Sequence, residues 1–261
     1  MNSRELMDKL FLMDTTANYS HSCDTFKSGD PEKEIKKVGV CMFATVEVIR
    51  EAAKWGADIL ITHEPVFYNH MDTTGHLENN PVYLGKRSII DESGMAICRI
   101  HDHMHHANLD RIALGEMEYL GLEYAHVANP YYAVNRFELK EPIKANDLLE
   151  RIKDVLGVKH ARLCGDGEME ITNITGCFGT PGHILDEIND PWCQVVLAGE
   201  TAEWYECEYI RDAAALGMKK AMIVMGHCGS ERAGMVYMAE GMKKDYPELD
   251  IKYFECGECY N

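Results

Sequence analysis

Apolar runs rich in β-branched residues alternate with amphipathic stretches along most of the chain. This alternation is typical of βαβ units and predicts an α/β fold with mixed sheets flanked by helices. In the first half, strands are expected over 37–44, 57–62 and 95–100, and helices over 45–55, 83–91 and 110–120. In the second half, strands are expected over 132–139, 161–163, 170–177, 193–198 and 220–225, and helices over 146–156, 202–216 and 230–244.

The pattern predicts two α/β lobes, residues 1–130 and 131–261, with the last segment able to pack back onto the first lobe. A domain built from both termini around an inserted middle is the alternative. The two halves share a feature, since Glu51–Gly56 precedes a strand ending at His63 and Asp212–Gly217 precedes a strand ending at His227. Open α/β sheets bind ligands beyond the carboxyl ends of their strands, so the predicted site is a cleft at these ends.

Composition narrows the class of protein. A formal net charge of −17 disfavours long contacts with nucleic acid or anionic lipid, because both are repelled by an acidic surface. The N-terminus lacks the apolar core of a signal peptide, and no apolar run is long enough to span a membrane. We therefore expect a cytoplasmic protein with ten free cysteines, of which Cys41, Cys98 and Cys193 lie in apolar runs and are expected to be buried.

Three clusters supply metal-ligand side chains. In the first, an apolar strand ends at His63-Glu64-Pro65. Consecutive strand residues point to opposite faces, so His63 and Glu64 reach one site only if the chain leaves strand geometry there, as Pro65 favours. A strand-end histidine with local hydrogen bonds is the alternative.

The second cluster is the segment 101–110, which contains four histidines and two aspartates after a predicted strand. Such tracts commonly bind metal ions. The alternative is a solvated loop that caps the helix at Asp110, and capping does not prevent the second carboxylate oxygen from facing an ion.

The third cluster is Gly226-His227-Cys228-Gly229-Ser230-Glu231. The glycines permit a tight turn, Ser230 is expected to cap the following helix, and Glu231 falls in its first turn, where the helix dipole favours a carboxylate. His227 and Glu231 would then point into the same space, although a purely capping role for Glu231 stays open.

Cysteine and methionine residues outside these clusters could also bind metal ions but have simpler interpretations. Cys256 and Cys259 form a single CxxC close to the C-terminus, which fits a frayed tail, a redox pair or an accessory metal site. Met235, Met238 and Met242 fall at helical spacing and are expected to pack in the core.

Together the clusters favour a pair of divalent metal ions. Histidines with carboxylates suit Zn, Fe, Mn or Ni better than a closed structural zinc site, which favours thiolates. Two ions roughly 3.5–4 Å apart, with Glu231 as the natural bridging ligand, would activate water and polarise a carbonyl or phosphoryl group, and hydrolysis is the simplest chemistry of such a site.

With these clusters in place, the chain resembles the Nif-three-like dinuclear metal centre hexameric proteins, also known as the GTP cyclohydrolase I type 2 homologue family. The resemblance covers nearly the whole chain and rests on Gly29-Asp30-Pro31, Val38-Gly39-Val40, Gly56–His63, His106-Ala107-Asn108-Leu109-Asp110, Ala198-Gly199-Glu200 and Gly226–Glu231. It implies metal ligands at His63, Glu64, Asp110, His227 and Glu231, with His106 as a general acid-base or extra ligand. It also implies a homohexamer.

The chain departs from that family in three respects. The family usually has two successive histidines before the proline, whereas the second position here is Glu64. The first strand usually has an aspartate where this chain has Met42-Phe43-Ala44, and the long middle domain of larger relatives is missing.

The leading hypothesis is a metal-dependent hydrolase or cyclohydrolase acting on a small molecule. The sequence contains no P-loop or dinucleotide fingerprint that would select a purine. The alternatives are a metal-binding or metal-delivery protein without turnover and an oligomeric scaffold with structural metals.

Overall fold

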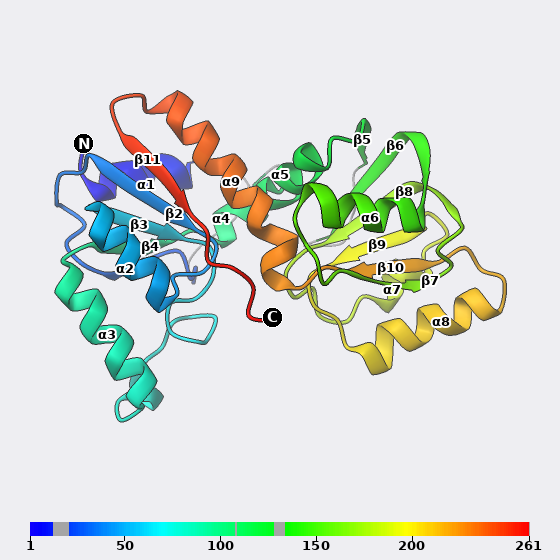
Figure 1. Cartoon of the computed structure of the whole chain (residues 1–261), viewed down its shortest axis with the longest axis horizontal. Helices are drawn as coiled ribbons and strands as arrows, with labels where there is room; N and C mark the ends of the chain where they lie inside the picture. The colour runs from blue at the N-terminus through cyan, green and yellow to red at the C-terminus, as the bar shows by residue number, and fades with distance from the viewer. Residues whose placement is uncertain (13–20, 108, 128–133, 261) are drawn as a thin grey trace. The chain divides into compact units, whose positions relative to one another are not determined.

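The computed structural model describes residues 1–12, 21–107, 109–127 and 134–260. It forms two compact units (Figure 1). Unit 1 combines Met1–Arg111 with Met235–Asn261, and unit 2 is Ile112–Gly234. The boundary that the sequence suggests near residue 130 lies outside the described residues.

Unit 1 is built on a five-stranded mixed sheet in the order β1-β4-β3-β2-β11. Strands β4, β3, β2 and β11 are parallel, and β1 pairs with β4 in the antiparallel sense. The strands are β1 (Phe26–Ser28), β2 (Lys37–Cys41), β3 (Ile59–Thr62), β4 (Ala96–Arg99) and β11 (Asp250–Phe254). Because β3 and β4 are parallel neighbours, the residues that follow them emerge at the same edge of the sheet.

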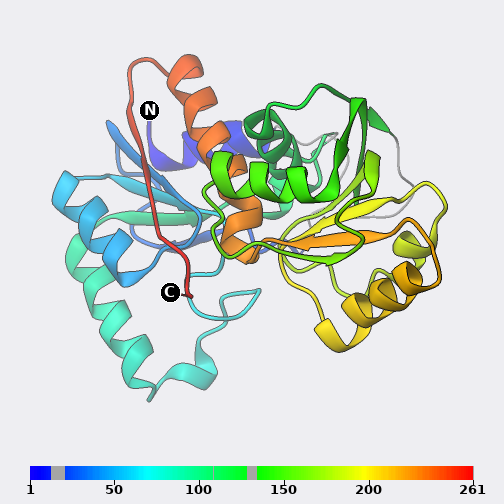
Figure 2. The ribbon, with the colours of Figure 1, turned by 45° about the vertical axis from the view of Figure 1, so that its right-hand side comes forward.

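The helical elements of unit 1 are α1 (Ser3–Phe11), α2 (Val46–Trp55), η1 (Gly75–Leu77), α3 (Pro81–Ser93), α4 (Asp102–His105) and the later part of α9 (His227–Asp245). Apolar residues of α2 and α3, including Val48, Ile49 and Ile90, form a core with Leu60 and Ile97 of the sheet. Helix α1 lies on the other side of that sheet (Figures 1 and 2).

Helix α2 illustrates how local sequence sets these boundaries. Thr45 caps its N-terminus by accepting a hydrogen bond from the backbone N–H of Val48 at 3.2 Å. The helix ends at Gly56, whose φ of 83° lies in the left-handed region that glycine adopts without strain. The chain then turns directly into β3, which delivers the first candidate ligands.

Unit 2 contains a six-stranded mixed sheet in the order β5-β6-β8-β9-β10-β7. The central strands β8, β9 and β10 are parallel, and the outer pairings are antiparallel. The strands are β5 (Tyr124–Val127), β6 (Asn135–Lys144), β7 (Arg162–Gly165), β8 (Glu170–Cys177), β9 (Val195–Ala198) and β10 (Ala221–Val224).

The helical elements of unit 2 are α5 (Arg111–Leu120, whose first residue belongs to unit 1), α6 (Ala145–Val155), α7 (Leu185–Asn189), the π-helix η2 (Glu203–Cys207), α8 (Glu208–Ala215) and the start of α9. Helices α6 and α8 lie on opposite sides of the sheet (Figures 1 and 2). Ile210 of α8 packs with Met222 and Val196 of the strands. The predicted α/β class with mixed sheets flanked by helices is confirmed.

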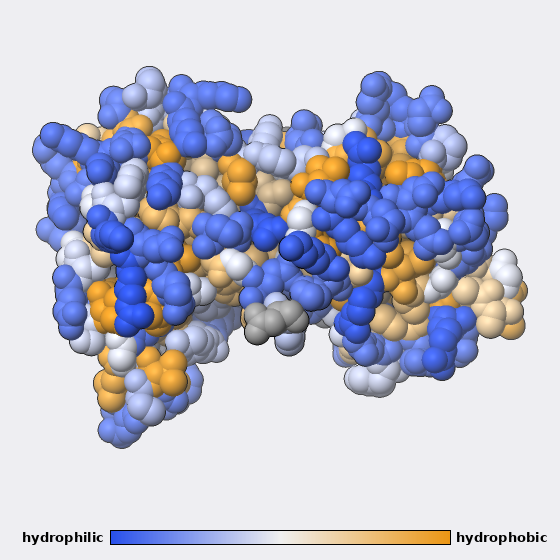
Figure 3. All heavy atoms as spheres, in the orientation of Figure 1, coloured by the Kyte–Doolittle hydropathy of each residue, from blue (hydrophilic) through white to orange (hydrophobic). Residues whose placement is uncertain are grey.

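Burial agrees with the predictions for the sulfur-containing residues. Cys41, Cys98 and Cys193 are each at most 1% exposed, and Met235, Met238 and Met242 are buried as well. Hydrophilic residues predominate on the face of each unit seen in Figure 3. Within the described part of the chain, no helix has the length and apolar character needed to cross a membrane.

Candidate metal centre

The first candidate ligands follow the carboxyl end of β3. His63 is fully buried and Glu64 is 6% exposed. Their backbone N–H groups still bond to residues at the end of β2: His63 donates to Cys41 O at 3.3 Å, and Glu64 donates to Met42 O at 3.0 Å. The His63 Nε2 and Glu64 Oε1 atoms nevertheless lie 4.0 Å apart. Both side chains therefore reach one place, as the sequence analysis required for a shared site.

Two histidines from the end of β4 join His63. His101 stacks on His63 with ring centroids 4.7 Å apart, and His105 of α4 contacts the same ring edge-on at 5.0 Å. One ring nitrogen of each of the three histidines lies within 4.8 Å of those of the other two. His101 Nε2 is also 3.6 Å from Glu64 Oε1. We call His63, His101 and His105 the three-histidine group.

The Nδ1 atom of every ring in the three-histidine group is engaged by an oxygen. The acceptors are Ile100 O for His63 at 2.9 Å, Asp102 Oδ1 for His101 at 3.0 Å and Asp110 Oδ2 for His105 at 3.0 Å. A carbonyl or carboxylate oxygen accepts, so Nδ1 holds the proton and the lone pair of the neutral ring is on Nε2. Oxygen acceptors behind the ligating nitrogen are the usual arrangement around metal-bound histidines.

The spacing of the Nε2 atoms fits a metal ion. His63 Nε2 and His105 Nε2 lie 3.2 Å apart. Two imidazoles on one tetrahedral Zn²⁺, with Zn–N bonds of about 2.0–2.1 Å, have their nitrogens about 3.3 Å apart. Lone pairs that face each other at this distance repel, and a cation placed between them converts the repulsion into two coordinate bonds.

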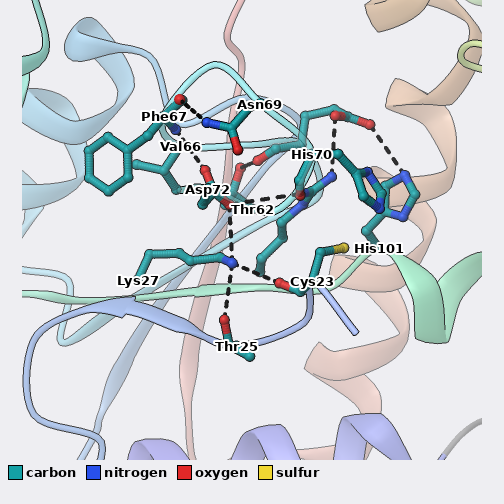
Figure 4. A network of polar contacts seen from close by, with 12 residues as sticks. Cys23, Thr25, Lys27, Thr62, Val66, Phe67, Asn69, His70, Asp72 and His101 are labelled. Atoms are coloured by element: carbon teal, nitrogen blue, oxygen red, sulfur yellow. Dashed lines mark hydrogen bonds and ion pairs between the residues drawn. The ribbon is translucent and has the colours of Figure 1, made fainter. Parts of the chain in front are cut away.

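A buried arginine fixes the segment that follows β3. Arg99, fully buried on β4, donates from Nε to His63 O at 2.8 Å and also to the backbone oxygen of His70, and its Nη2 lies 3.5 Å from Glu64 Oε2. A second ion pair joins Lys27 Nζ to Asp72 Oδ2 at 3.1 Å, with both side chains almost fully buried (Figure 4). Residues 63–73 are thus held in place around Glu64.

Lys86 provides a third support for this segment. Its ammonium group donates to Val66 O at 2.7 Å and lies 5.2 Å from the ring centroid of Tyr68. Burial lowers the pKa of Lys86 to about 8, because the charged amine is removed from water. The backbone beyond Glu64 is therefore held by charged side chains from β4, α3 and the segment that contains β1.

The rest of the histidine-rich segment has other roles. His103 turns away from the three-histidine group, bonds Asp24 Oδ2 through Nδ1 at 2.6 Å and stacks on Phe11. Asp110 is 8% exposed and contacts His105 as described above. His106 ends α4 and is half-buried, with its backbone N–H bonded to Asp102 O at 2.8 Å. Asn108 lies outside the described residues.

Unit 2 holds the remaining predicted ligands. His227 and Glu231 occupy the first turns of α9, with His227 Nε2 3.3 Å from Glu231 Oε2. Glu231 is 1% exposed. The Nδ1 atom of His227 lies 2.7 Å from Glu200 Oε1 and 3.2 Å from Thr180 Oγ1. This group again combines an imidazole that has an oxygen partner at Nδ1 with a buried carboxylate near Nε2.

The predicted capping role of Ser230 is wrong. Helix α9 begins at His227, directly after Gly226 with its φ of 79°, so Ser230 lies inside the helix. Its hydroxyl donates to His227 O at 2.9 Å and accepts from the backbone N–H of Gly179 at 3.0 Å. His227 and Glu231 are consequently neighbours four residues apart on one helical face, which brings them together more directly than a turn would.

The backbone at Gly179 packs closely against the carboxylate of Glu231. Gly179 has a φ of 65°, and a Cβ added there would lie 2.3 Å from Glu231 Oε1. The backbone of this loop therefore touches the carboxylate, and only glycine leaves room for it.

Sequence reasoning missed His101, His105 and Glu200 as parts of these groups. His101 directly precedes α4 and His105 is its last residue, and the backbone N–H of His105 donates to His101 O at 3.1 Å, a spacing of four residues that is visible in the sequence. Glu200 follows β9, the parallel neighbour of β10, and its position relative to His227 depends on that pairing. The structure brings His63, Glu64 and Asp110 together with the two missed histidines, and His227 with Glu231.

Known proteins are similar to this chain over most of its sequence. The sequence profile of the Duf34/NIF3 (NGG1p interacting factor 3) family matches residues 5–257. A protein from Clostridium acetobutylicum called GTP cyclohydrolase 1 type 2 homolog is 24% identical over 239 residues, covering 85% of this chain and 82% of its own. A protein of the same name from Haemophilus influenzae is 25% identical, with 84% of each chain covered.

Solved structures share the fold. A Bacillus cereus protein related to NIF3 superposes with a TM-score of 0.76 at 15% identity, covering 100% of this chain and 98% of its own. Reduced HcgD from Methanocaldococcus jannaschii superposes with a TM-score of 0.74 at 18% identity and 97% coverage of both chains.

Proposed function

Because the chain belongs to the Duf34/NIF3 family, we propose that it binds two divalent metal ions and uses them to hydrolyse a small molecule. The observation that carries the proposal is the three-histidine group, in which every Nδ1 is bonded to oxygen and two Nε2 atoms face each other at 3.2 Å. One ion is assigned to this group in unit 1 and the other to His227 and Glu231 in unit 2.

The donor set suits Zn, Fe, Mn or Ni. Neutral imidazoles with carboxylates are borderline ligands, and the carboxylates of Glu64, Asp110 and Glu231 offset part of the charge of two dications. A bound divalent ion supplies Lewis acidity, lowering the pKa of water and polarising a carbonyl or phosphoryl oxygen. The acidic replacement at Glu64 shifts the preference towards harder ions than two histidines would.

Residues of the protein itself would position the metal ligands and transfer protons. Arg99 holds the Glu64 carboxylate and the His63 backbone, and Glu200 orients His227. We assign general acid-base chemistry to His106, since it directly follows His105 and is half-buried. Replacement of His106 by Gln is expected to lower kcat by roughly 10²–10⁴-fold without changing metal content, whereas a ligand at this position would lose metal.

The name of the relatives, GTP cyclohydrolase 1 type 2 homolog, suggests a substrate class for the proposal. Ring opening of a cyclic amide is a hydrolysis, and it uses the same Lewis acidity as ester or phosphoester cleavage. A substrate screen should therefore include cyclic amides beside phosphate and carboxylic esters.

Metal analysis of the purified protein tests the proposal. We expect at least two ions per chain in the wild type, and the loss of one ion from unit 1 in the double variant His63→Ala with His105→Ala. His76→Ala is the matched control, because His76 is an exposed histidine of unit 1 on η1. Less than one ion per chain would contradict the proposal, as would full metal content after His227→Ala with Glu231→Ala.

Separate measurements address the dinuclear centre and turnover. X-ray absorption is expected to detect metal–metal scattering at roughly 3.5–4 Å if the ions share a bridging carboxylate. Tight metal binding with no turnover in any substrate class would instead support a metal-delivery protein or a scaffold. We also propose the hexamer that the family resemblance implies, and native mass spectrometry measures its mass directly.

A further inference from the structure

A second set of metal-ligand side chains lies in unit 1, outside the three-histidine group. Cys23 precedes β1, His70 lies on the segment after β3, and Asp102 begins α4. One ligand atom from each of these residues lies within 4.8 Å of those of the other two. We propose that Cys23, His70 and Asp102 bind a divalent metal ion of their own, and we call them the cysteine site.

Hydrogen bonds hold the buried Cys23 and the half-buried Asp102 in position. Cys23 is 1% exposed, and its Sγ lies 3.4 Å from Asp102 Oδ1 and 3.5 Å from Asp24 Oδ1. Asp102 Oδ2 accepts from Ser22 Oγ at 2.8 Å and from the backbone N–H of Cys23 at 3.2 Å. These hydrogen bonds therefore hold the sulfur and the carboxylate side by side, although the two residues are far apart in the sequence.

The local charge favours a cation. The Asp102 carboxylate accepts hydrogen bonds from Ser22 Oγ at 2.8 Å and from the backbone N–H of Cys23 at 3.2 Å. The Asp24 carboxylate accepts from the backbone N–H groups of His101 at 2.6 Å and His103 at 2.9 Å. The Cys23 sulfur thus lies between two carboxylates, and a divalent ion bound there would balance their charge.

The third member lies on a fixed backbone with an exposed ring. His70 O accepts from the Arg99 guanidinium, and Asn69, its neighbour, donates to Phe67 O at 3.0 Å and Thr73 O at 2.8 Å. The exposed imidazole of His70 gives a metal ion a route from solvent. Among the residues drawn in Figure 4, the Cys23 side chain lies on the same side as His70 and His101.

The ligand chemistry selects the ion. A thiolate, an imidazole and a carboxylate suit Zn²⁺ or Co²⁺, and three protein ligands leave a fourth position for water. Binding breaks the S–H bond of Cys23, forms a sulfur–metal bond and releases the proton to solvent. The site differs from the three-histidine group in containing sulfur, although Asp102 contacts both through its bond to His101 Nδ1.

Titration with Co²⁺ tests the cysteine site, because a thiolate bound to Co²⁺ gives a charge-transfer band in the near ultraviolet that imidazole and carboxylate ligands do not give. The full chain is used with Cys256→Ser and Cys259→Ser, so that the C-terminal thiols cannot contribute. We expect the band in this background, and its loss with one fewer Co²⁺ bound after Cys23→Ser. His70→Ala should weaken binding at this site by at least roughly 10–100-fold, and because His70 is exposed, this variant is expected to fold.

Cys98→Ser is the matched control, since it makes the same change at another buried cysteine of unit 1 and should retain the band. Absence of the band in the background protein, or its persistence after Cys23→Ser, would overturn the inference. The visible d–d absorption of Co²⁺ at the three-histidine group reports on the proposed function separately. Its loss in His63→Ala with His105→Ala, alongside a retained thiolate band, would show that the two groups bind separate ions.

Discussion

Glu116 places a fully buried carboxyl group on α5 in unit 2, and its protonation should set the pH dependence of stability. Its Oε1 accepts from the backbone N–H of Ala233 at 2.8 Å. Burial raises the pKa of Glu116 from 4.5 to about 8, a rise that the Ala233 hydrogen bond reduces and the negative charge of Glu231 increases. The folded protein therefore binds a proton there at neutral pH that the unfolded chain has released.

The sign and size of the effect follow from this difference. Between the unfolded pKa of 4.5 and the folded pKa of about 8, the folded state binds more protons, so the free energy of unfolding falls as the pH rises. At 1.36 kcal/mol per pKa unit, the ionisation of Glu116 should lower the free energy of unfolding of the metal-free protein by about 3 kcal/mol between pH 5 and pH 7.5. Glu116→Gln keeps an oxygen for Ala233 and removes the ionisation, so this part of the pH dependence should disappear.

Urea unfolding of chelator-treated protein across this pH range measures the prediction. The difference in unfolding free energy between Glu116→Gln and wild type should grow by about 3 kcal/mol from pH 5 to pH 7.5, in favour of the variant. Glu118→Gln, an exposed site on the same helix, is the control and should leave the pH dependence unchanged. A difference for Glu116→Gln that stays constant over the range would refute the assigned pKa and the burial argument behind it.

Three further substitutions test the metal groups. Gly179→Ala should displace the Glu231 carboxylate, because its Cβ would lie 2.3 Å from Oε1, and metal analysis should show a lower metal content per chain. Asp110→Asn weakens the acceptor of His105 Nδ1 and should reduce metal affinity in unit 1 by roughly 10–100-fold in a chelator competition, an unchanged affinity being the contrary result. Arg99→Met leaves a buried carboxylate without its guanidinium and should destabilise the protein by about 3–5 kcal/mol in urea unfolding, with a change under 1 kcal/mol showing that the ion pair contributes little.

Much of the fold could be predicted because periodicity reports burial. The strand expected over 170–177 matches β8, and the helix expected over 45–55 matches α2 to within one residue. Short elements were missed, since β1 and β11 complete the sheet through partners distant in sequence, β4 and β2. Helix α1 was also missed, although Asn2 and Glu5 form a capping box that is visible in the sequence.

The helix expected over 202–216 begins as the π-helix η2 and continues as α8. Apolar spacing alone does not distinguish these two windings over so short a segment. The start of α9 was placed too late for a related reason, because Gly229 resembled a turn residue although Gly226 is the one with a positive φ.

The candidate site was predictable where a candidate ligand follows a strand directly. His63 and Glu64 follow β3, so the strand prediction placed them. The choice among His101, His103, His105 and His106 depended on α4, a single helical turn that points His101 and His105 to His63 and turns His103 to Asp24. Cys23 and His70 were not predicted at all, because no sequence spacing connects them with Asp102.

The oxygen partners of the three-histidine rings have a consequence for the protons that accompany metal uptake. Each Nδ1 already donates a hydrogen bond, so the neutral rings offer Nε2 atoms without protons, and metal binding to neutral rings should release none. Cys23 must surrender its thiol proton. In calorimetric titrations, the heat of filling the three-histidine group should therefore be the same in every buffer, while the heat of filling the cysteine site should follow the ionisation enthalpy of the buffer.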